Sequence, residues 1–187
     1  KVFLPIYSTF LQRAYDQILH HASRHNTNIV IGVDRAGLNP NDGETHQGIF
    51  DMSFFRAVPN LIIMCPKNFK ELEMMMDQAI DLKRPVVIRF TRGGESSITF
   101  ESNKRLQLGK SEILKEGNDI TIIGIGKTVS KAYEISKELE KDNINSEVIN
   151  ARYLKPCDRN QVKESIEKTK KVVVIEDSTI LGGLCST

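Results

Sequence analysis

Short apolar runs alternate with segments of helical periodicity along most of the chain. Runs rich in Val and Ile, typical of buried strands, span 1–7, 29–33, 61–65, 85–90, 120–125, 146–150 and 172–175. Apolar residues at helical spacing fill 8–22, 68–80, 129–142 and 159–168. This alternation predicts the α/β class, with parallel sheets that carry helices on both faces.

The alternation is interrupted once and therefore predicts two successive α/β units. Residues 99–118 are polar and lack strong periodicity, which suits a linker between a unit at 1–98 and a unit at 119–187. The first residues read as a buried strand that needs neighbours on both sides, and the last residues stop at a glycine turn where a helix should begin. We therefore expect a piece of a longer polypeptide.

Composition narrows the class of protein and of partner. The chain has 187 residues, of which 40% are hydrophobic and 27% charged, as is ordinary for a soluble globular protein. Its 26 basic and 24 acidic residues are interspersed, so no face for nucleic acid or an anionic membrane is expected. No apolar run approaches the ~18 residues that span a bilayer. Three widely separated cysteines suit a reducing compartment, so a cytoplasmic or plastid-type location is expected.

A long polar segment at 34–51 follows the apolar run at 29–33. Glycine, proline, asparagine and aspartate replace apolar patterning here, and loops of this length in compact domains are usually functional. The segment carries four side chains suited to chemistry: Arg35, Asp42, His46 and Asp51. Open α/β sheets bind ligands beyond the carboxyl ends of their strands, so the position also favours a site.

Acid–base and phosphate chemistry are the functions that these residue types suit. An imidazole such as that of His46 can hand protons to substrate oxygens, although a loop histidine is more often a structural hydrogen-bonding residue. Arg35 and Arg92 each follow a strand and should meet at one sheet edge, where two guanidinium groups suit a phosphate dianion. Taken singly, each arginine would be a solvated surface charge.

The start of the first helix offers a second set of candidates. Tyr7, Phe10 and Arg13 are three residues apart and should project along one side of its first turns. An aromatic ring there can stack on a flat ligand, whereas apolar residues at helical spacing more often mark a core face. Both alternatives stay open for Phe10.

Two further motifs predict no chemistry. The pair Gly124 and Gly126 lacks the third glycine of a dinucleotide fingerprint, so we interpret it as a tight strand-to-helix turn. The remaining histidines, His20, His21 and His25, have no metal-type spacing with a carboxylate and are expected at the surface. No metal site is predicted within the chain.

Three segments of the chain together match a known family. Residues 7–17 read Tyr-Ser-Thr-Phe-Leu-Gln-Arg-Ala-Tyr-Asp-Gln, residues 34–37 Asp-Arg-Ala-Gly, and residues 42–48 Asp-Gly-Glu-Thr-His-Gln-Gly. With Arg92-Gly93, Leu154-Lys-Pro156, Glu176 and Gly182-Gly183, they resemble 1-deoxy-D-xylulose-5-phosphate synthase over nearly the whole chain. The third segment also fits transketolase, whereas the first two favour the synthase.

The resemblance implies a thiamine-diphosphate enzyme of three domains. An N-terminal domain would hold the diphosphate and Mg²⁺, and this chain would supply most of a pyrimidine-binding domain and the start of a transketolase C-terminal-type domain. The family's Gly-Asp-Gly motif with its following asparagine is absent, as is the glutamate that activates the cofactor's aminopyrimidine. The chain alone is therefore expected to be inactive, and the family implies a homodimer.

The resemblance also assigns roles to residues. Phe10 and Arg13 would contact thiamine diphosphate, His46 would face its reactive carbon, and Asp42 would bind a substrate hydroxyl, so that His46 and Asp42 are the expected catalytic residues. Substrate binding is assigned to Tyr7, Arg35, Asp42, His46 and Arg92.

The reaction implied is the decarboxylation of pyruvate and transfer of its two-carbon unit to glyceraldehyde 3-phosphate. Its product, 1-deoxy-D-xylulose 5-phosphate, is a precursor of isoprenoids by the non-mevalonate pathway and of thiamine. Three alternatives stay open: a transketolase, a 2-oxo-acid dehydrogenase beta subunit, and a non-catalytic assembly module.

Overall fold

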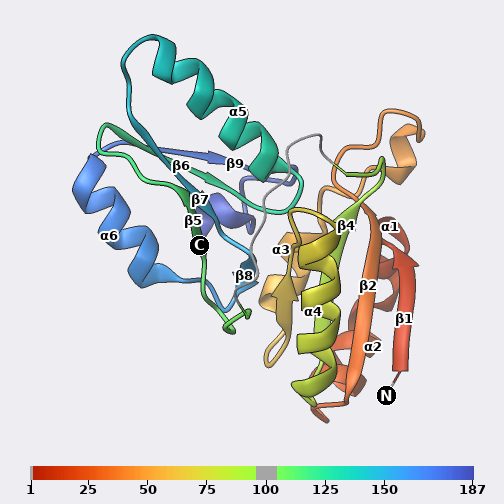
Figure 1. Ribbon diagram of the computed structural model, residues 1–187. Coiled ribbons are helices and arrows are strands. Elements are labelled where there is room, and N and C mark those ends of the chain that lie inside the picture. The colour runs from red at the N-terminus through yellow and green to blue at the C-terminus, as the bar shows by residue number, and fades with distance from the viewer. Residues whose placement is uncertain (1, 96–104) are drawn as a thin grey trace.

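Two α/β units lie side by side in the computed structural model, which describes residues 2–95 and 105–187 (Figure 1). The first sheet has the strand order β1-β2-β4-β3-β8. Its strands are β1 (Val2–Tyr7), β2 (Ile29–Ala36), β3 (Ile62–Met64), β4 (Val86–Thr91) and β8 (Tyr153–Lys155). The first four run parallel, and β8 pairs antiparallel with β3.

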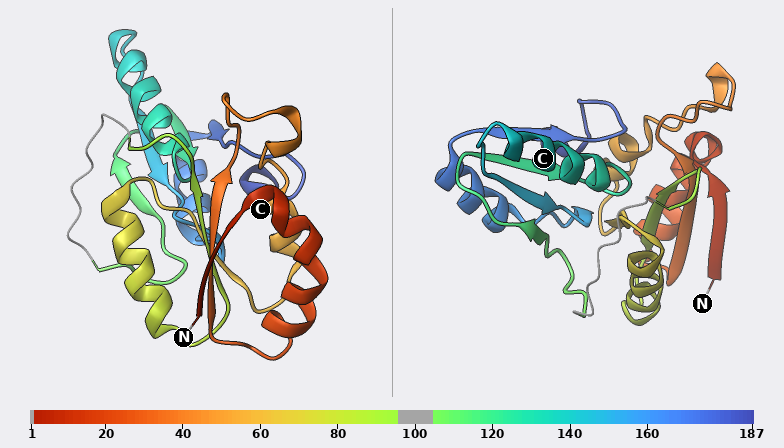
Figure 2. Two further views of the ribbon diagram at one scale, coloured as in Figure 1. Left: turned by 90° about the vertical axis from the view of Figure 1, so that its right-hand side faces the viewer. Right: turned by 45° about the horizontal axis from the view of Figure 1, so that its top comes forward.

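Helices cover both faces of the first sheet (Figure 2). One face carries α4 (Phe69–Asp81), which begins where the Asn68 side chain accepts a hydrogen bond from the Glu71 N–H at 2.9 Å. The other face carries a helical path after β1 and the helix α3 (Asp51–Ala57). That path consists of α1 (Ser8–Leu11), η1 (Gln12–Ala14), α2 (Tyr15–Gln17) and the π-helical η2 (Ile18–Ser23).

The second sheet has the strand order β5-β7-β6-β9. Its strands are β5 (Glu112–Lys115), β6 (Ile120–Gly124), β7 (Ser146–Asn150) and β9 (Val172–Ile175). All neighbours are parallel except β5, which runs antiparallel to β7. The helices α5 (Thr128–Lys141) and α6 (Arg159–Thr169) lie on opposite faces of this sheet (Figure 1).

A shared apolar core joins the two units. Side chains alternate along each strand, so Val33 and Ile63 of the first sheet and Ile123 and Ile149 of the second belong to one buried cluster. The opposite faces form separate cores under α4 and under α5. Ala36, at the carboxyl end of β2, belongs to the same cluster.

The α/β class and its mostly parallel sheets agree with the sequence prediction, but several elements do not. β1 was expected between two strands, yet among the described residues it pairs with β2 alone and exposes Val2, Phe3 and Leu4. The helix expected at 8–22 is not regular, because Ala14 departs from α-helical dihedrals (φ −102°, ψ 12°). The short elements α3 and β8 were not predicted.

The range expected to be a linker, 99–118, includes β5, which extends the second sheet. The expected boundary after residue 98 lies outside the described residues. Among the residues described, no helix is both long and apolar enough to cross a lipid bilayer.

Candidate active site

Aromatic rings gather where β1 passes into α1. The rings of Tyr7 and Phe10 stack with centroids 5.4 Å apart and an interplanar angle of 28°. The ring of His46, from the distant loop, meets Phe10 edge-on at 5.6 Å. The Arg13 guanidinium lies 5.8 Å from the centroid of Phe10. Residues from both candidate sets of the sequence therefore share one surface.

Phe10 belongs to this surface and not to the core. Its exposed fraction is 39%, whereas that of the adjacent Leu11 is 1%. A cavity of about 280 Å³ opens beside it, lined by Pro5, Ile6, Tyr7, Phe10 and Asp34. The alternative that Phe10 is a core residue is therefore wrong, while Leu11 is buried as the helical spacing predicted.

Two arginines converge on one carboxylate. Nη1 of Arg35 and Nη1 of Arg92 lie 2.9 Å and 2.8 Å from the same Asp42 Oδ1. The Asp42 side chain is only 7% exposed, and its Oδ2 has no hydrogen-bond partner among the described residues. The Arg35 guanidinium also stacks over Tyr7, 4.2 Å from the ring centroid. The cluster combines two positive charges, one negative charge and an aromatic surface.

The loop that carries Asp42 and His46 is folded on itself. The Asn39 side chain donates to the carbonyls of Arg35 and Gly37 at 2.9 Å and 3.1 Å. The Gln47 side chain accepts from the Asn39 N–H at 2.8 Å and donates to the Asp42 carbonyl at 3.1 Å. Neither Asn39 nor Gln47 was predicted as a functional residue. They satisfy the backbone of a segment that has little regular structure.

Within this loop, η3 (Glu44–His46) fixes the histidine. The His46 N–H donates to the Gly43 carbonyl at 3.0 Å, and its Nδ1 lies 2.9 Å from the Thr45 hydroxyl. The His46 ring thus contacts the Thr45 hydroxyl through Nδ1 and the Phe10 ring edge-on. His46 is therefore held on the surface that it shares with Phe10.

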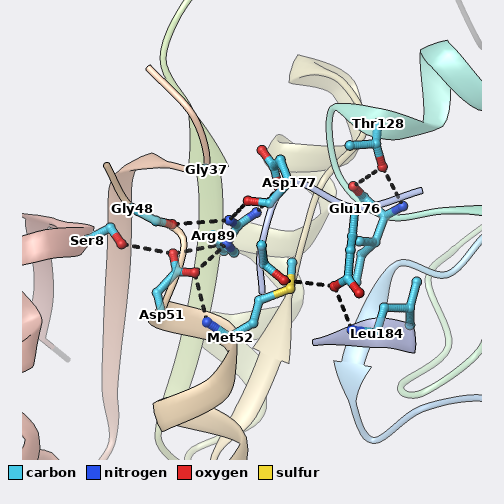
Figure 3. A network of polar contacts seen from close by, with 12 residues as sticks. Ser8, Gly37, Gly48, Asp51, Met52, Arg89, Thr128, Glu176, Asp177 and Leu184 are labelled. Atoms are coloured by element: carbon cyan, nitrogen blue, oxygen red, sulfur yellow. Dashed lines mark hydrogen bonds and ion pairs between the residues drawn. The ribbon is translucent and has the colours of Figure 1, made fainter. Parts of the chain in front are cut away.

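Asp51, the fourth polar residue singled out in the loop, points into the protein. Its carboxylate accepts from Arg89 Nε at 3.0 Å and from the Ser8 hydroxyl at 3.0 Å (Figure 3). Burial raises the pKa of Asp51, against the opposing effect of Arg89. Burial would by itself lower the pKa of Arg89, but Asp51 and Asp177 raise it above its usual value. Asp51 therefore supports the site from beneath.

The family is decided by comparison of the sequence with known domain families. The transketolase pyrimidine-binding domain matches residues 1–94, and the transketolase C-terminal domain matches residues 109–187. The chain belongs to the transketolase family. The first range holds four strands of the first sheet, and the second holds the whole second sheet together with β8, which joins the first sheet.

Curated members of this family that are similar to the chain are named 1-deoxy-D-xylulose-5-phosphate synthase. The proteins of Halothermothrix orenii and of a Geobacillus species are each 44% identical and match 100% of the chain. The protein of Clostridium tetani is 44% identical over 95% of the chain. The chain spans 29–30% of the length of these relatives.

Solved transketolases have the same fold. A split-gene transketolase, described as an inactive beta4 tetramer, superposes with a TM-score of 0.91 at 32% identity, over 98% of this chain and 59% of that chain. A transketolase variant of Pichia stipitis, in complex with fructose 6-phosphate, superposes with a TM-score of 0.83 over 96% of this chain and 27% of that chain. At 20% identity, the second match supports the fold alone.

Outside the candidate site, other residues singled out in this transketolase-family chain lie in turns, on the surface or in the core. Gly126, with φ +60°, turns the chain from β6 into α5, as predicted for this glycine pair. His20 is exposed on its helix and lies 2.7 Å from Asp16. Burial raises the pKa of Cys65 to about 12, which keeps its thiol protonated. Within the described ranges, no three His, Cys, Asp or Glu residues are placed to hold a metal ion.

Proposed function

We propose that this chain supplies the pyrimidine-binding and C-terminal units of a 1-deoxy-D-xylulose-5-phosphate synthase. The intact enzyme decarboxylates pyruvate and transfers the two-carbon unit to glyceraldehyde 3-phosphate. The observation that carries the proposal is the convergence of Arg35 and Arg92 on Asp42, beside the Phe10–His46 contact. Relatives that match the whole chain at 44% identity bear the name of this synthase.

The residues at the end of β1 suit the aminopyrimidine of thiamine diphosphate. The cavity there is lined by apolar and aromatic side chains together with Asp34, and the partly exposed Phe10 ring offers a flat surface for stacking. Arg13, over the same ring, adds a positive charge on this side. When bound, the cofactor supplies the nucleophilic carbon and the electron sink that decarboxylation of a 2-oxo acid needs.

His46 and Asp42 are the side chains that we assign to acid–base work and to substrate orientation. His46 exchanges a proton with the acceptor's carbonyl oxygen as that oxygen becomes a hydroxyl. Oδ1 of Asp42 is occupied by the two arginines, and its buried Oδ2 has no partner among the described residues, so it accepts from a substrate hydroxyl once the substrate displaces a side chain that covers it. The Tyr7 ring, stacked beneath Arg35, lies beside this acceptor site.

Arg35 and Arg92 form the phosphate anchor. Two guanidinium groups and one carboxylate leave a net charge of about +1, which favours a phosphate dianion. Arginine suits this role because its planar fork offers five N–H donors, and the contact with Asp42 is made through Nη1. An unphosphorylated acceptor gains nothing from this charge.

The diphosphate and Mg²⁺ are assigned to parts of the intact protein outside this chain. This assignment follows the family resemblance, which places the diphosphate and metal motif in an N-terminal domain, where carboxylates and phosphate oxygens would hold Mg²⁺. A homodimer and a cytoplasmic location are further parts of the proposal. They are consistent with the family and are tested by sedimentation and by localisation of the tagged enzyme.

The assay of the full-length protein with pyruvate, glyceraldehyde 3-phosphate, thiamine diphosphate and Mg²⁺ tests the proposal. We expect 1-deoxy-D-xylulose 5-phosphate and CO₂ in equal amounts, measured by mass spectrometry and a coupled CO₂ assay. Consumption of a ketose phosphate donor without CO₂ release would instead identify a transketolase, the activity named for the split-gene structural neighbour.

Cofactor binding separates the roles of this chain and of the rest of the enzyme. We expect the 187-residue chain alone to bind thiamine diphosphate too weakly for calorimetry, because the diphosphate and metal contacts are missing. The full-length protein should bind it with a magnesium-dependent affinity. Tight, magnesium-dependent binding to the isolated chain would contradict this division.

A further inference from the structure

The loop that carries Asp42 and His46 is closed by a narrow neck, the pair Gly37 and Gly48. The Gly37 N–H donates to the Gly48 carbonyl at 2.8 Å, and the Gly48 N–H donates to the Gly37 carbonyl at 3.0 Å. Both active-site side chains lie on the distal side of this two-bond closure. The orientation of the neck therefore sets where they point.

The neck is packed between the two units. A Cβ on Gly48 would lie 2.7 Å from the Ser8 hydroxyl of α1, whereas a Cβ on Gly37 would lie 2.0 Å from Asp177 Oδ2, just beyond β9. Gly37 also has φ +76°, which side chains disfavour. The second unit thus touches the loop directly at its neck, where Asp177 lies beside Gly37 (Figure 3).

Arg89 of β4 ties these parts together from beneath. Its Nη1 donates to Asp177 Oδ1 at 2.7 Å, and its Nη2 donates to the Asp177 carbonyl at 3.2 Å and to the Gly48 carbonyl at 3.5 Å. Its Nε donates to Asp51, which also accepts from Ser8 (Figure 3). The buried Arg89 guanidinium therefore contacts the neck, the start of α3 and the second unit. Asp51, its partner in α3, also accepts a hydrogen bond from Ser8 at the start of α1.

We propose that Asp177 and Arg89 are positioning residues that hold the loop neck, so that the second unit sets the placement of His46 and Asp42 against Phe10. The inference rests on the proposed function and deepens it. It gives the second unit a part in the active site, where the sequence suggested only assembly.

Replacing Asp177 with asparagine tests the positioning role while sparing the fold. The amide has the shape of the carboxylate but no charge, and Arg89 remains paired with Asp51, so no buried charge is left alone. In the full-length enzyme we expect kcat to fall roughly 10-fold or more, because misplacement by about 1 Å can cost about 10²-fold. The KM for pyruvate should be unchanged.

Hydrogen exchange provides a readout that is independent of substrates. In the Asp177→Asn enzyme, the amides of residues 37–48 should exchange faster, because the neck loses a support on one side. A double-mutant cycle with His46→Ala adds a second readout. If Asp177 acts through the loop, its effect on kcat should be much smaller once His46 is absent.

Glu112→Gln is the matched control. Glu112 is also a carboxylate of the second unit at the junction, 14% exposed against 18% for Asp177. It pairs with Lys67 at 2.7 Å and Arg152 at 2.8 Å, away from the loop neck. The kcat of this variant and its exchange at residues 37–48 should match the parent.

Equal losses of kcat in Asp177→Asn and Glu112→Gln, or unchanged exchange at 37–48 in Asp177→Asn, would overturn the positioning role. Additive effects of Asp177→Asn and His46→Ala would do the same. Failure of the proposed function is distinguishable. In that case the parent enzyme forms no 1-deoxy-D-xylulose 5-phosphate, while the exchange comparison still supports or refutes the hold on the neck.

Discussion

Both units end their parallel strands in polar loops, but they use those polar groups differently. At the first edge, Arg35 and Arg92 are 26% and 46% exposed and share a carboxylate beside open aromatic rings. At the second edge, the Thr128 hydroxyl donates to the Ile175 carbonyl at 2.6 Å and accepts from the Ile125 N–H at 3.1 Å. Glu176 accepts from the N–H groups of residues 184 and 185.

The comparison shows that position at a strand's carboxyl end does not by itself make a site. At the second edge, Thr128 and Glu176 bind the backbone of their own unit and close turns, while Asp177 pairs with the buried Arg89 of the first unit. The polar groups of the first edge pair with each other at the surface, and the backbone bonds of the loop are made by other residues, Asn39 and Gln47. At the first edge, therefore, Asn39 and Gln47 support the loop backbone, and the charged side chains of Arg35 and Arg92 stay partly exposed.

Among the changes at the first edge, removal of the His46 imidazole should have the largest effect on turnover. In the full-length enzyme, His46→Ala should lower turnover by roughly 10²-fold or more, the usual cost of losing an acid–base group. Binding of thiamine diphosphate, followed by calorimetry, should barely change. His20→Ala, at an exposed helical position, is the control and should behave as the parent. Unchanged turnover in His46→Ala would make His46 a structural residue.

The phosphate anchor should show the next largest effect. Arg35→Ala or Arg92→Ala removes charge-assisted hydrogen bonds worth about 1.5–3 kcal/mol. The catalytic efficiency with glyceraldehyde 3-phosphate should fall by about 10- to 150-fold, since about 1.4 kcal/mol corresponds to a factor of ten.

Unphosphorylated glyceraldehyde is the control for the anchor. The arginine variants and the parent should use it about equally poorly, and the KM for pyruvate should stay the same. An equal loss with both acceptors would mean that Arg35 and Arg92 support the loop through Asp42 and do not bind the phosphate.

The sequence predicts the regular elements well where periodicity is long. The strands at 29–33 and 146–150 and the helices at 68–80 and 129–142 lie within two or three residues of their observed bounds. The short strands β5 and β8 carry no such signal, because each exists through pairing with a distant strand. β8 crosses from the second unit to the first sheet, which local pattern cannot indicate.

At the candidate site, the clustered surface residues were easier to predict than the buried residues beneath them. The seven candidates from Tyr7 to Arg92 lie close together, as their strand ends and the family resemblance indicated. Arg89 was missed because it is embedded in an apolar strand, and Asp177 because its partner is 88 positions away. Local signals identify chemical groups, whereas long-range contacts decide how these groups are held.

The smallest effect is expected at the second edge, where Thr128→Val removes one hydroxyl at nearly constant volume. The variant leaves the Ile125 N–H and the Ile175 carbonyl without that partner, so the free energy of unfolding should fall by about 0.5–1.5 kcal/mol. Urea denaturation of the full-length enzyme measures this loss, and Thr128→Ser, which keeps the hydroxyl, should retain most of the stability.

The catalytic efficiency per folded molecule should not change in either variant, because the hydrogen bonds of the Thr128 side chain go to the backbone of its own unit. A drop in efficiency with phosphorylated and unphosphorylated acceptors alike would show that the second edge takes part in the chemistry, and the contrast between the two edges would then fail.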